Sequence, residues 1–235
     1  MALESVAFRP YTGVIDPNSK RYQTAKAMVE EGKAQKTETQ KKYEEQLEEL
    51  RTLLRILGKD TSAIDEMMKL YEGDEELAIR NLMGRLDEDG DPINSYGVSG
   101  MDITGKDPST IQKIIDIPEA ARQDMFDTSL REFIRDYGGM GNGETDRTAV
   151  YTRYQLSVEK SDRLKGTWTL QHYEGCYNRA FYNIVKETNP DWKPGDKFDA
   201  SIFDGITREE IERQIVQTVD RDLTLISGNG IDIKV

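Results

Sequence analysis

The spacing of apolar residues restricts the fold of this chain more than any other feature of the sequence. Within short segments these residues recur every three or four positions. The clearest stripe, with successive spacings of 4, 3, 4 and 3, consists of Tyr43, Leu47, Leu50, Leu54 and Leu57. Such spacing places the side chains on one face of an α-helix, here an a/d seam of about two heptads. The sequence therefore predicts a mainly α protein.

Prolines, glycines and capping residues divide the chain into four predicted parts. These are an extended arm over 1–19, a long helix with a helical hairpin resembling a coiled coil over 20–86, an acidic glycine-rich linker over 87–107, and a helical C-terminal domain over 108–235. The long helix is expected to begin after Asn18 or Ser19 and to stop at Gly58. The arm contains Pro10 and Pro17, which interrupt a helix, and its scattered apolar residues are expected to dock on a neighbouring chain.

In the C-terminal domain, Asp107 and Pro108 are expected to start a helix. Residues 149–158 fit a strand, since Tyr154, Leu156 and Val158 alternate, and a helix fits nearly as well. An aromatic helix is expected over 167–186. Another helix is expected to begin at a capping box of Thr207 and Glu210 and to carry Ile211, Ile215, Val216 and Val219. The tail predicts a small β-hairpin whose two strands carry Leu223 and Leu225, and Ile231, Ile233 and Val235.

The charge composition argues against a nucleic-acid-binding protein. The chain has 32 Lys and Arg against 44 Asp and Glu, a formal net charge of −12. Direct binding to nucleic acid needs a basic surface and is not expected. Residues 61–107 alone contain 4 basic and 12 acidic residues. We interpret this acidic region as a solvated surface, and a docking surface for a basic partner is the alternative.

Hydropathy and cysteine content indicate the compartment. No apolar run approaches the roughly 20 residues that cross a bilayer, and the first twenty residues contain no apolar segment typical of a signal peptide. One cysteine, Cys176, allows no intrachain disulfide. We therefore expect no membrane insertion and a location in the cytoplasm or in a virion.

One segment resembles a phosphate-binding P-loop. Residues 100–107 contain its two glycines and its lysine, but Asp107 stands where the motif needs Ser or Thr. Pro108 follows at once, and no hydrophobic strand precedes the segment. We interpret it as a polar turn before a helix.

A second segment resembles the front of a calcium-binding loop. Asp87, Asp89 and Asp91 occupy its first, third and fifth positions, whereas Pro92 and Val98 replace the glycine and glutamate that an EF-hand needs. We interpret it as a solvated turn, with an irregular cation site as the alternative.

His172 and Cys176 are the only residues of their kinds, four positions apart. This spacing supplies half of a zinc site. No other histidine or cysteine completes it, so we interpret both as packing residues. The neighbouring aromatic residues are expected to form the domain core rather than a ligand platform; they are Trp168, Tyr173, Tyr177, Phe181, Tyr182 and Trp192. The sequence thus predicts no metal and no cofactor.

These features favour a non-enzymatic structural or adaptor subunit of a larger assembly, such as a virion component or another ordered bacterial or phage complex. The candidate partner-binding residues are Phe8 and Tyr11 in the arm and Glu30 and Glu31 in the polar part of the long helix. Leu47 and Leu50 are expected to be core, and residues 20–42 to face partners. Two alternatives remain. One is an acidic protein that masks a basic surface, and the other is an enzyme with an unrecognised pair of carboxylates.

Overall fold

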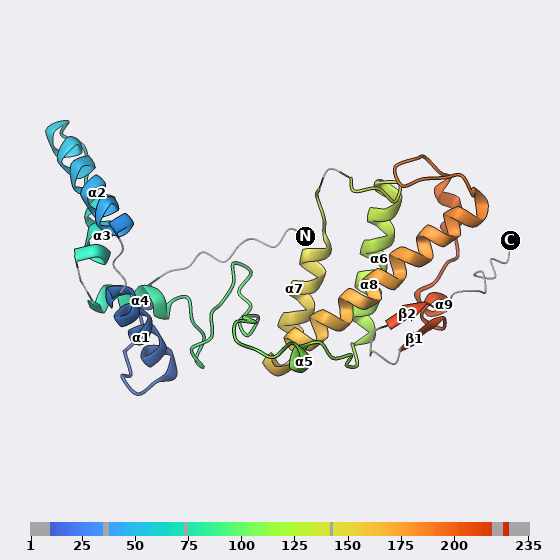
Figure 1. The fold of residues 1–235 in the computed structure, drawn as a ribbon, viewed down its shortest axis with the longest axis horizontal. Coiled ribbons are helices and arrows are strands. Elements are labelled where there is room, and N and C mark those ends of the chain that lie inside the picture. The colour runs from blue at the N-terminus through green and yellow to red at the C-terminus, as the bar shows by residue number, and fades with distance from the viewer. Residues whose placement is uncertain (1–9, 35–37, 73–74, 142, 218–222, 226–235) are drawn as a thin grey trace. The chain divides into compact units, whose positions relative to one another are not determined.

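The computed structural model describes residues 10–34, 38–72, 75–141, 143–217 and 223–225. It is mainly α, which confirms the predicted fold class (Figure 1). The chain divides into two compact units between Asp102 and Ile103. We call them the N-terminal unit and the C-terminal unit. The division falls inside the segment predicted as a linker.

The helices of the N-terminal unit are α1 (Lys20–Ala34), α2 (Glu38–Ile56), α3 (Ser62–Glu72) and α4 (Glu75–Met83). The long helix expected up to Leu57 corresponds to α1 and α2, on either side of residues 35–37, which lie outside the described ranges. Ser19 accepts a hydrogen bond from the backbone N–H of Tyr22 at 3.2 Å, as expected of an N-cap. Gly58 follows α2 with φ of +61°, a conformation that glycine adopts without strain, and so ends the helix as predicted.

A small core holds α1, α4 and part of the arm together. Its buried residues are Ala25, Ile79, Met83 and Leu86, with Tyr11, Ile15, Tyr22, Val29 and Leu82 packed around them. The backbone N–H of Tyr11 also donates to the carbonyl of Arg80 at 2.9 Å. Of the described part of the arm, Tyr11 and Ile15 therefore pack on their own unit and not, as had been expected, on another chain, whereas Val14 is exposed.

Residues 86–102 form a chain of turns within the N-terminal unit. Leu86 bridges to Pro92, and Ile93 bridges to Ser99. The first turn lies on α1, because Arg21 Nε donates to the carbonyl of Asp87 at 3.0 Å. The first turn of the segment predicted as a linker is thus folded against a helix.

The C-terminal unit is built around one long helix. Its elements are α5 (Pro108–Ile111), α6 (Glu119–Arg135), α7 (Arg147–Ser157), α8 (Lys160–Thr188), the 3₁₀-helix η1 (Ala200–Phe203), α9 (Arg208–Glu212), β1 (Ile215–Gln217) and β2 (Leu223–Leu225). Helices α6 and α7 pack along α8 (Figure 1). The segment 149–158, for which a strand was the first expectation and a helix the alternative, is helical over 149–157 and forms most of α7.

The core of this unit is aromatic, as predicted. Tyr177, Phe181 and Trp192 are fully buried, and they meet Phe126, Phe133, Phe198 and Phe203 through edge or tilted ring contacts. Ring pairs of this kind add to the stabilisation from apolar burial. Two of the aromatic residues predicted for the core differ: Tyr182 is partly exposed at its rim, and Trp168 is not part of the core cluster.

For the C-terminal segment, the predicted start of a helix is confirmed, whereas its predicted extent is wrong. The capping box of Thr207 and Glu210 is present at the start of α9. The helix was expected to include Ile215 and Val216, but these residues form β1, which pairs antiparallel with β2. Both are β-branched, so a strand suits them once a partner strand supplies hydrogen bonds. The predicted second strand over 231–235 lies outside the described residues.

Candidate functional site

The N-terminal unit leaves one apolar face of α2 uncovered. Leu50, Leu53, Ile56 and Leu57 are 42%, 52%, 76% and 59% exposed. At about 100° per residue they lie on one side of the helix. Four large apolar side chains on adjacent turns form a contiguous stripe, which differs from the scattered apolar residues of an ordinary surface.

Helix α3 covers a different part of α2. Leu47 of α2 and Met68 of α3 are buried, and Arg51 Nε lies 2.6 Å from Asp65 Oδ1. Leu47, Arg51 and Leu54 share a face, so this is the face turned toward α3. The prediction that Leu50 is core is therefore wrong. The apolar arc of α2 spans roughly half its circumference, and one neighbouring helix covers only part of it.

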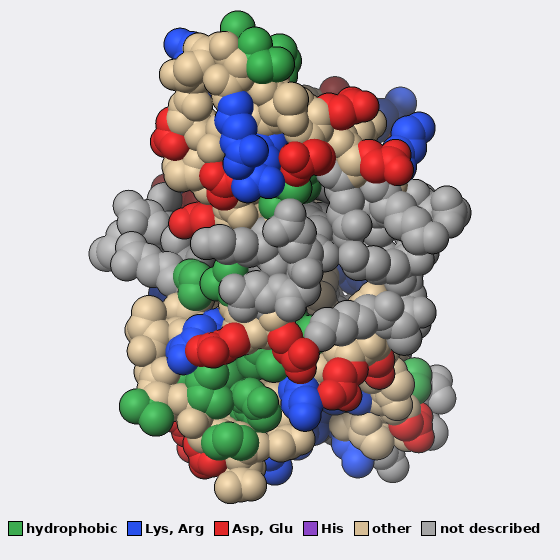
Figure 2. Space-filling model, turned by 90° about the vertical axis from the view of Figure 1, so that its left-hand side faces the viewer, with side chains coloured by type: hydrophobic (Ala, Val, Ile, Leu, Met, Phe, Trp, Pro, Cys, Tyr) green, Lys and Arg blue, Asp and Glu red, His purple; other side chains and the backbone are tan. Residues whose placement is uncertain are grey.

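A shallow groove runs along the uncovered side of α2. It is lined by Leu53 and Ile56 together with Glu45, Glu48, Glu49 and Thr52. Among these residues the only charges are negative. Figure 2 shows hydrophobic side chains at the top of its view, over the end of α2, with acidic and basic side chains below them. The lining of the groove itself thus combines apolar side chains with acidic ones.

The predicted partner-binding residues have different surroundings. Phe8 lies outside the described residues. Tyr11 packs in its own unit, and the guanidinium of Arg21 lies 5.4 Å from the centre of its ring. Glu30 and Glu31 are exposed on α1, and Glu30 is 3.7 Å from Lys26. None of the three described residues, Tyr11, Glu30 and Glu31, lines the groove on α2, which the sequence analysis did not predict. The sequence does contain a signal for this surface. Leu53 and Ile56 lie outside the strict heptad stripe, so the apolar arc of the helix is wider than a single seam.

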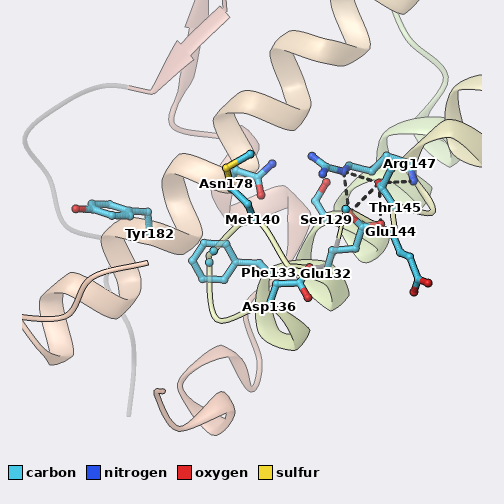
Figure 3. A pocket seen from close by; sticks show the side chains of 13 residues that line it. Ser129, Glu132, Phe133, Asp136, Met140, Glu144, Thr145, Arg147, Asn178 and Tyr182 are labelled. Atoms are coloured by element: carbon cyan, nitrogen blue, oxygen red, sulfur yellow. Dashed lines mark hydrogen bonds and ion pairs between the residues drawn. The ribbon is translucent and has the colours of Figure 1, made fainter. Parts of the chain in front are cut away.

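The C-terminal unit contains a cavity of about 380 Å³ between α6, α8 and the loop that joins α6 to α7. Phe133 and Met140 supply apolar walls, and Ser129, Glu132 and Arg147 supply polar ones. Figure 3 shows Asn178 and Met140 facing the group of Ser129, Glu132 and Thr145. The carboxylates of Glu132, Asp136 and Glu144 line this cavity, and a pair of carboxylates is the catalytic arrangement that the sequence left open.

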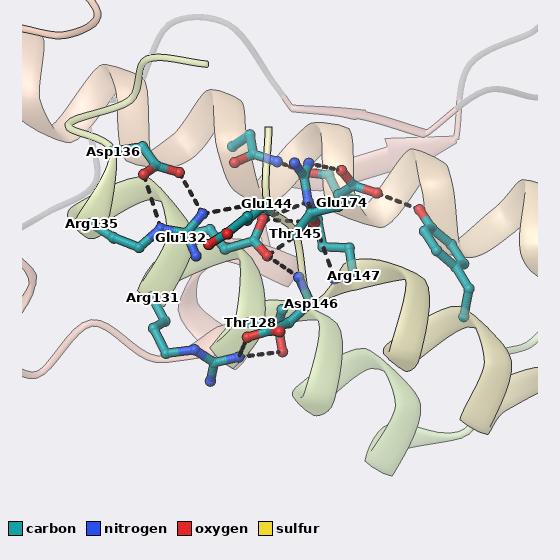
Figure 4. Close-up of polar contacts among 12 residues, drawn as sticks. Thr128, Arg131, Glu132, Arg135, Asp136, Glu144, Thr145, Asp146, Arg147 and Glu174 are labelled. Carbon is teal, nitrogen blue, oxygen red and sulfur yellow. Dashed lines mark hydrogen bonds and ion pairs between the residues drawn. The ribbon is translucent and has the colours of Figure 1, made fainter. Parts of the chain in front are cut away.

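The carboxylates beside this cavity are engaged by the loop (Figure 4). Glu132 is buried and accepts from the Thr145 hydroxyl at 3.0 Å and from the Asp146 N–H at 2.5 Å. Arg147 Nε is 2.8 Å from Glu132 Oε2. The same guanidinium also bonds to Glu174 on α8. These bonds fasten the start of α7 to both neighbouring helices.

The outer end of the same loop is held by a second group. Arg135 donates twice to Asp136, at 2.9 and 2.7 Å, and once to the carbonyl of Glu144 at 2.8 Å. The Arg135 hydrogen bonds lower the pKa of the Asp136 carboxyl. A carboxylate held in its ionised form in this way stabilises the loop and is poorly suited to accept a proton from a substrate.

Another cluster fastens α9 to the core helices. Glu212 accepts from Arg122 at 2.6 Å and from the Tyr177 hydroxyl at 2.5 Å. The buried Arg208 donates to Glu119 at 2.8 Å. Burial, followed by the Glu212 hydrogen bond, raises the pKa of Tyr177. The buried charges of this unit are thus paired, as burial requires.

His172 and Cys176 do not form a site with one another. The His172 ring packs edge-on against Trp168, with centroids 4.8 Å apart. Cys176 is buried, and its thiol points to the carbonyl of Leu223 on β2 at 3.6 Å. Burial raises the pKa of this thiol to about 11, which makes a reactive thiolate rare at neutral pH.

The two motif-like segments form turns. Asp107 caps α5 by accepting from the N–H of Ser109 at 2.9 Å. Asp87 Oδ1 accepts from the N–H groups of Asp89 and Asp91 at 3.0 and 2.9 Å. Within the described ranges, no three His, Cys, Asp or Glu side chains converge as metal ligands would. None of the described helices is long and apolar enough to cross a membrane.

These features define a mainly α protein of two compact units, with an uncovered apolar helix face in the first and a loop tied down by ion pairs in the second. The chain belongs to the family described as "Domain of unknown function (DUF3879)", whose model matches residues 15–235. No curated protein and no solved structure matches the chain.

Proposed function

We propose that this protein is a structural or adaptor subunit that binds another protein chain through the uncovered face of α2. The observation that carries the proposal is the exposure of Leu50, Leu53, Ile56 and Leu57. Removing such a stripe from water is favourable by roughly 25 cal/mol per Å². A helix that leaves half of its apolar arc in water gains this energy only when a partner covers it.

The cavity in the C-terminal unit supports an enzyme less well. Glu132 accepts hydrogen bonds on both carboxylate oxygens, and Glu174 is bonded to Arg147 and Tyr151. These contacts join three helices and leave the carboxylates with structural roles. We therefore place the activity in protein binding, and the kind of assembly in the class favoured by the sequence, an ordered complex such as a virion. The support for this class is the sequence pattern alone.

The test compares Leu53→Asp with Leu156→Asp in the full chain. Both side chains are 52% exposed, and Leu156 lies on α7 in the other unit. The native complex is isolated from the source organism, and its mass is measured by size exclusion with light scattering. We expect Leu53→Asp to reduce the mass to that of one chain, with an unchanged far-UV circular dichroism spectrum, and Leu156→Asp to leave the complex intact. A wild-type chain that is monomeric in its native source contradicts the proposal.

A further inference from the structure

Three parts of the structure offer charged or apolar groups for a further ligand: the cavity beside Glu132, the paired charges around Glu212, and the groove on α2. The carboxylates of the first two are bonded to arginine and hydroxyl groups of the same unit. The groove on α2 differs, because its apolar side chains lie in solvent next to exposed glutamates.

We propose that the groove on α2 binds an amphipathic helix of a partner protein, one that carries Lys or Arg beside its apolar stripe. This inference rests on the proposed function and specifies the chemistry of the partner. Leu53 and Ile56 form the apolar floor, and Glu45, Glu48 and Glu49 form the border. An occupant that fits both parts has apolar side chains on one face and positive charges along one edge of that face.

The shape of the surface selects a helix as the occupant. The stripe from Leu50 to Leu57 spans about 10 Å along the axis of α2. A second helix packs on such a stripe at an interaxial distance of about 8–10 Å, with its side chains between those of α2. A partner in extended form would gain no backbone hydrogen bonds there, because the backbone of α2 is already paired within the helix.

The charges select a basic partner over a second copy of this chain. A parallel contact between two copies would bring Glu45, Glu48 and Glu49 of both chains together, where like charges repel. The net charge of −12 adds to this repulsion over a longer range. Lys or Arg on a different chain would instead face these three carboxylates, and with Arg51 only 3.3 Å from Glu48, new ion pairs would form mainly at Glu45 and Glu49.

The experiment measures binding of three synthetic peptides to the full-length chain by fluorescence anisotropy. Each peptide has 18 residues in a helical pattern. The first has a leucine face bordered by lysines, the second has glutamates in place of the lysines, and the third has serines in place of the leucines. We expect the Leu/Lys peptide to bind at least about tenfold more tightly than the other two. A tenfold difference in affinity corresponds to about 1.4 kcal/mol of binding free energy.

Variants of the chain then locate the binding. Leu53→Asp is expected to lower the affinity for the Leu/Lys peptide by about tenfold or more, and Leu156→Asp to leave this affinity unchanged. Glu45→Lys with Glu49→Lys is expected to weaken this peptide and to strengthen the Leu/Glu peptide. Equal binding of the Leu/Lys and Leu/Glu peptides, or binding that Leu53→Asp leaves unchanged, overturns the inference.

The outcomes separate this inference from the proposed function. If the native complex depends on Leu53 but the Leu/Lys peptide does not bind, the partner class is wrong and the adaptor function stands. If light scattering shows a dimer of this chain that Leu53→Asp dissociates, the occupant is a second copy, and the inference again fails alone. If Leu53→Asp leaves the native complex intact, the proposed function fails.

Discussion

Helix α8 contains two glycines whose replacement by alanine is predicted to have opposite effects on stability. A Cβ atom added at Gly175 would meet nothing within 4 Å. A Cβ atom added at Gly166 would lie 1.5 Å from the hydroxyl oxygen of Tyr154 and 2.3 Å from its Cζ atom. The Tyr154 ring is almost fully buried, so it cannot move aside without disturbing the contact between α7 and α8.

The magnitudes follow from two terms. Alanine is favoured over glycine inside a helix by about 0.5–1 kcal/mol, so Gly175→Ala should raise the free energy of unfolding by about that amount. Gly166→Ala gains the same term but loses about 1–3 kcal/mol or more through overpacking, and a contact this short lies at the upper end of that range. Because both variants gain the helix term, we expect them to differ by the overpacking loss alone, about 3 kcal/mol.

Urea denaturation followed by tryptophan fluorescence measures this difference. Both tryptophans, Trp168 and Trp192, belong to the C-terminal unit, so the signal reports the unfolding of that unit. In a Tyr154→Leu background, which lacks the clashing atoms, Gly166→Ala should become neutral or stabilising. If Gly166→Ala is as stable as Gly175→Ala in the wild-type background, the packing of α7 on α8 described above is wrong.

Three further perturbations test other parts of the structure. Tyr11→Ala should destabilise the N-terminal unit by about 1–3 kcal/mol, which faster amide hydrogen exchange in α4 would show. Val14→Ala, at an exposed position, should leave the exchange unchanged. Equal exchange in both variants would mean that the arm does not pack on α4. Arg147→Met should lower the free energy of unfolding by about 1–3 kcal/mol, because the buried Glu132 loses its ion-pair partner, and an unchanged urea midpoint would contradict this. Cys176 should react slowly with a thiol reagent at pH 8 in the folded chain and rapidly in urea. Its pKa, raised from 9.0 to about 11, means that the unfolded chain releases the proton first, so stability should fall as pH rises from about 9 to 11; a rise in that interval would refute the burial of the thiol.

Residues with local signals were predicted well. Gly58 ends α2, Asp107 caps α5, and Thr207 with Glu210 starts α9, because each of these acts through hydrogen bonds or backbone angles within a few residues. The aromatic spacing of α8 also predicted its buried side. In the candidate site, the sequence predicted that α2 is an apolar-faced helix, and it placed the partner-facing residues elsewhere.

Residues whose environment depends on distant parts of the chain were not predicted. Ile215 and Val216 fit the periodicity of a helix, and only the pairing with β2 makes them a strand. Tyr11 fits a free arm, and only its contact with α1 and α4 places it in a core. Glu132 and Arg147 are unremarkable among many charges until the loop between α6 and α7 folds back and brings them together.

The sequence by itself determined the mainly α class, most helix positions and their ends, because helical hydrogen bonds and caps join residues near one another in the chain. Only the tertiary structure decided which apolar faces are covered. Leu47 and Leu50 belong to the same stripe, yet α3 packs on the side of Leu47 and leaves Leu50 in water. Coverage depends on how many helices pack around α2 and from which side, and a period of 3.6 residues carries no information about either.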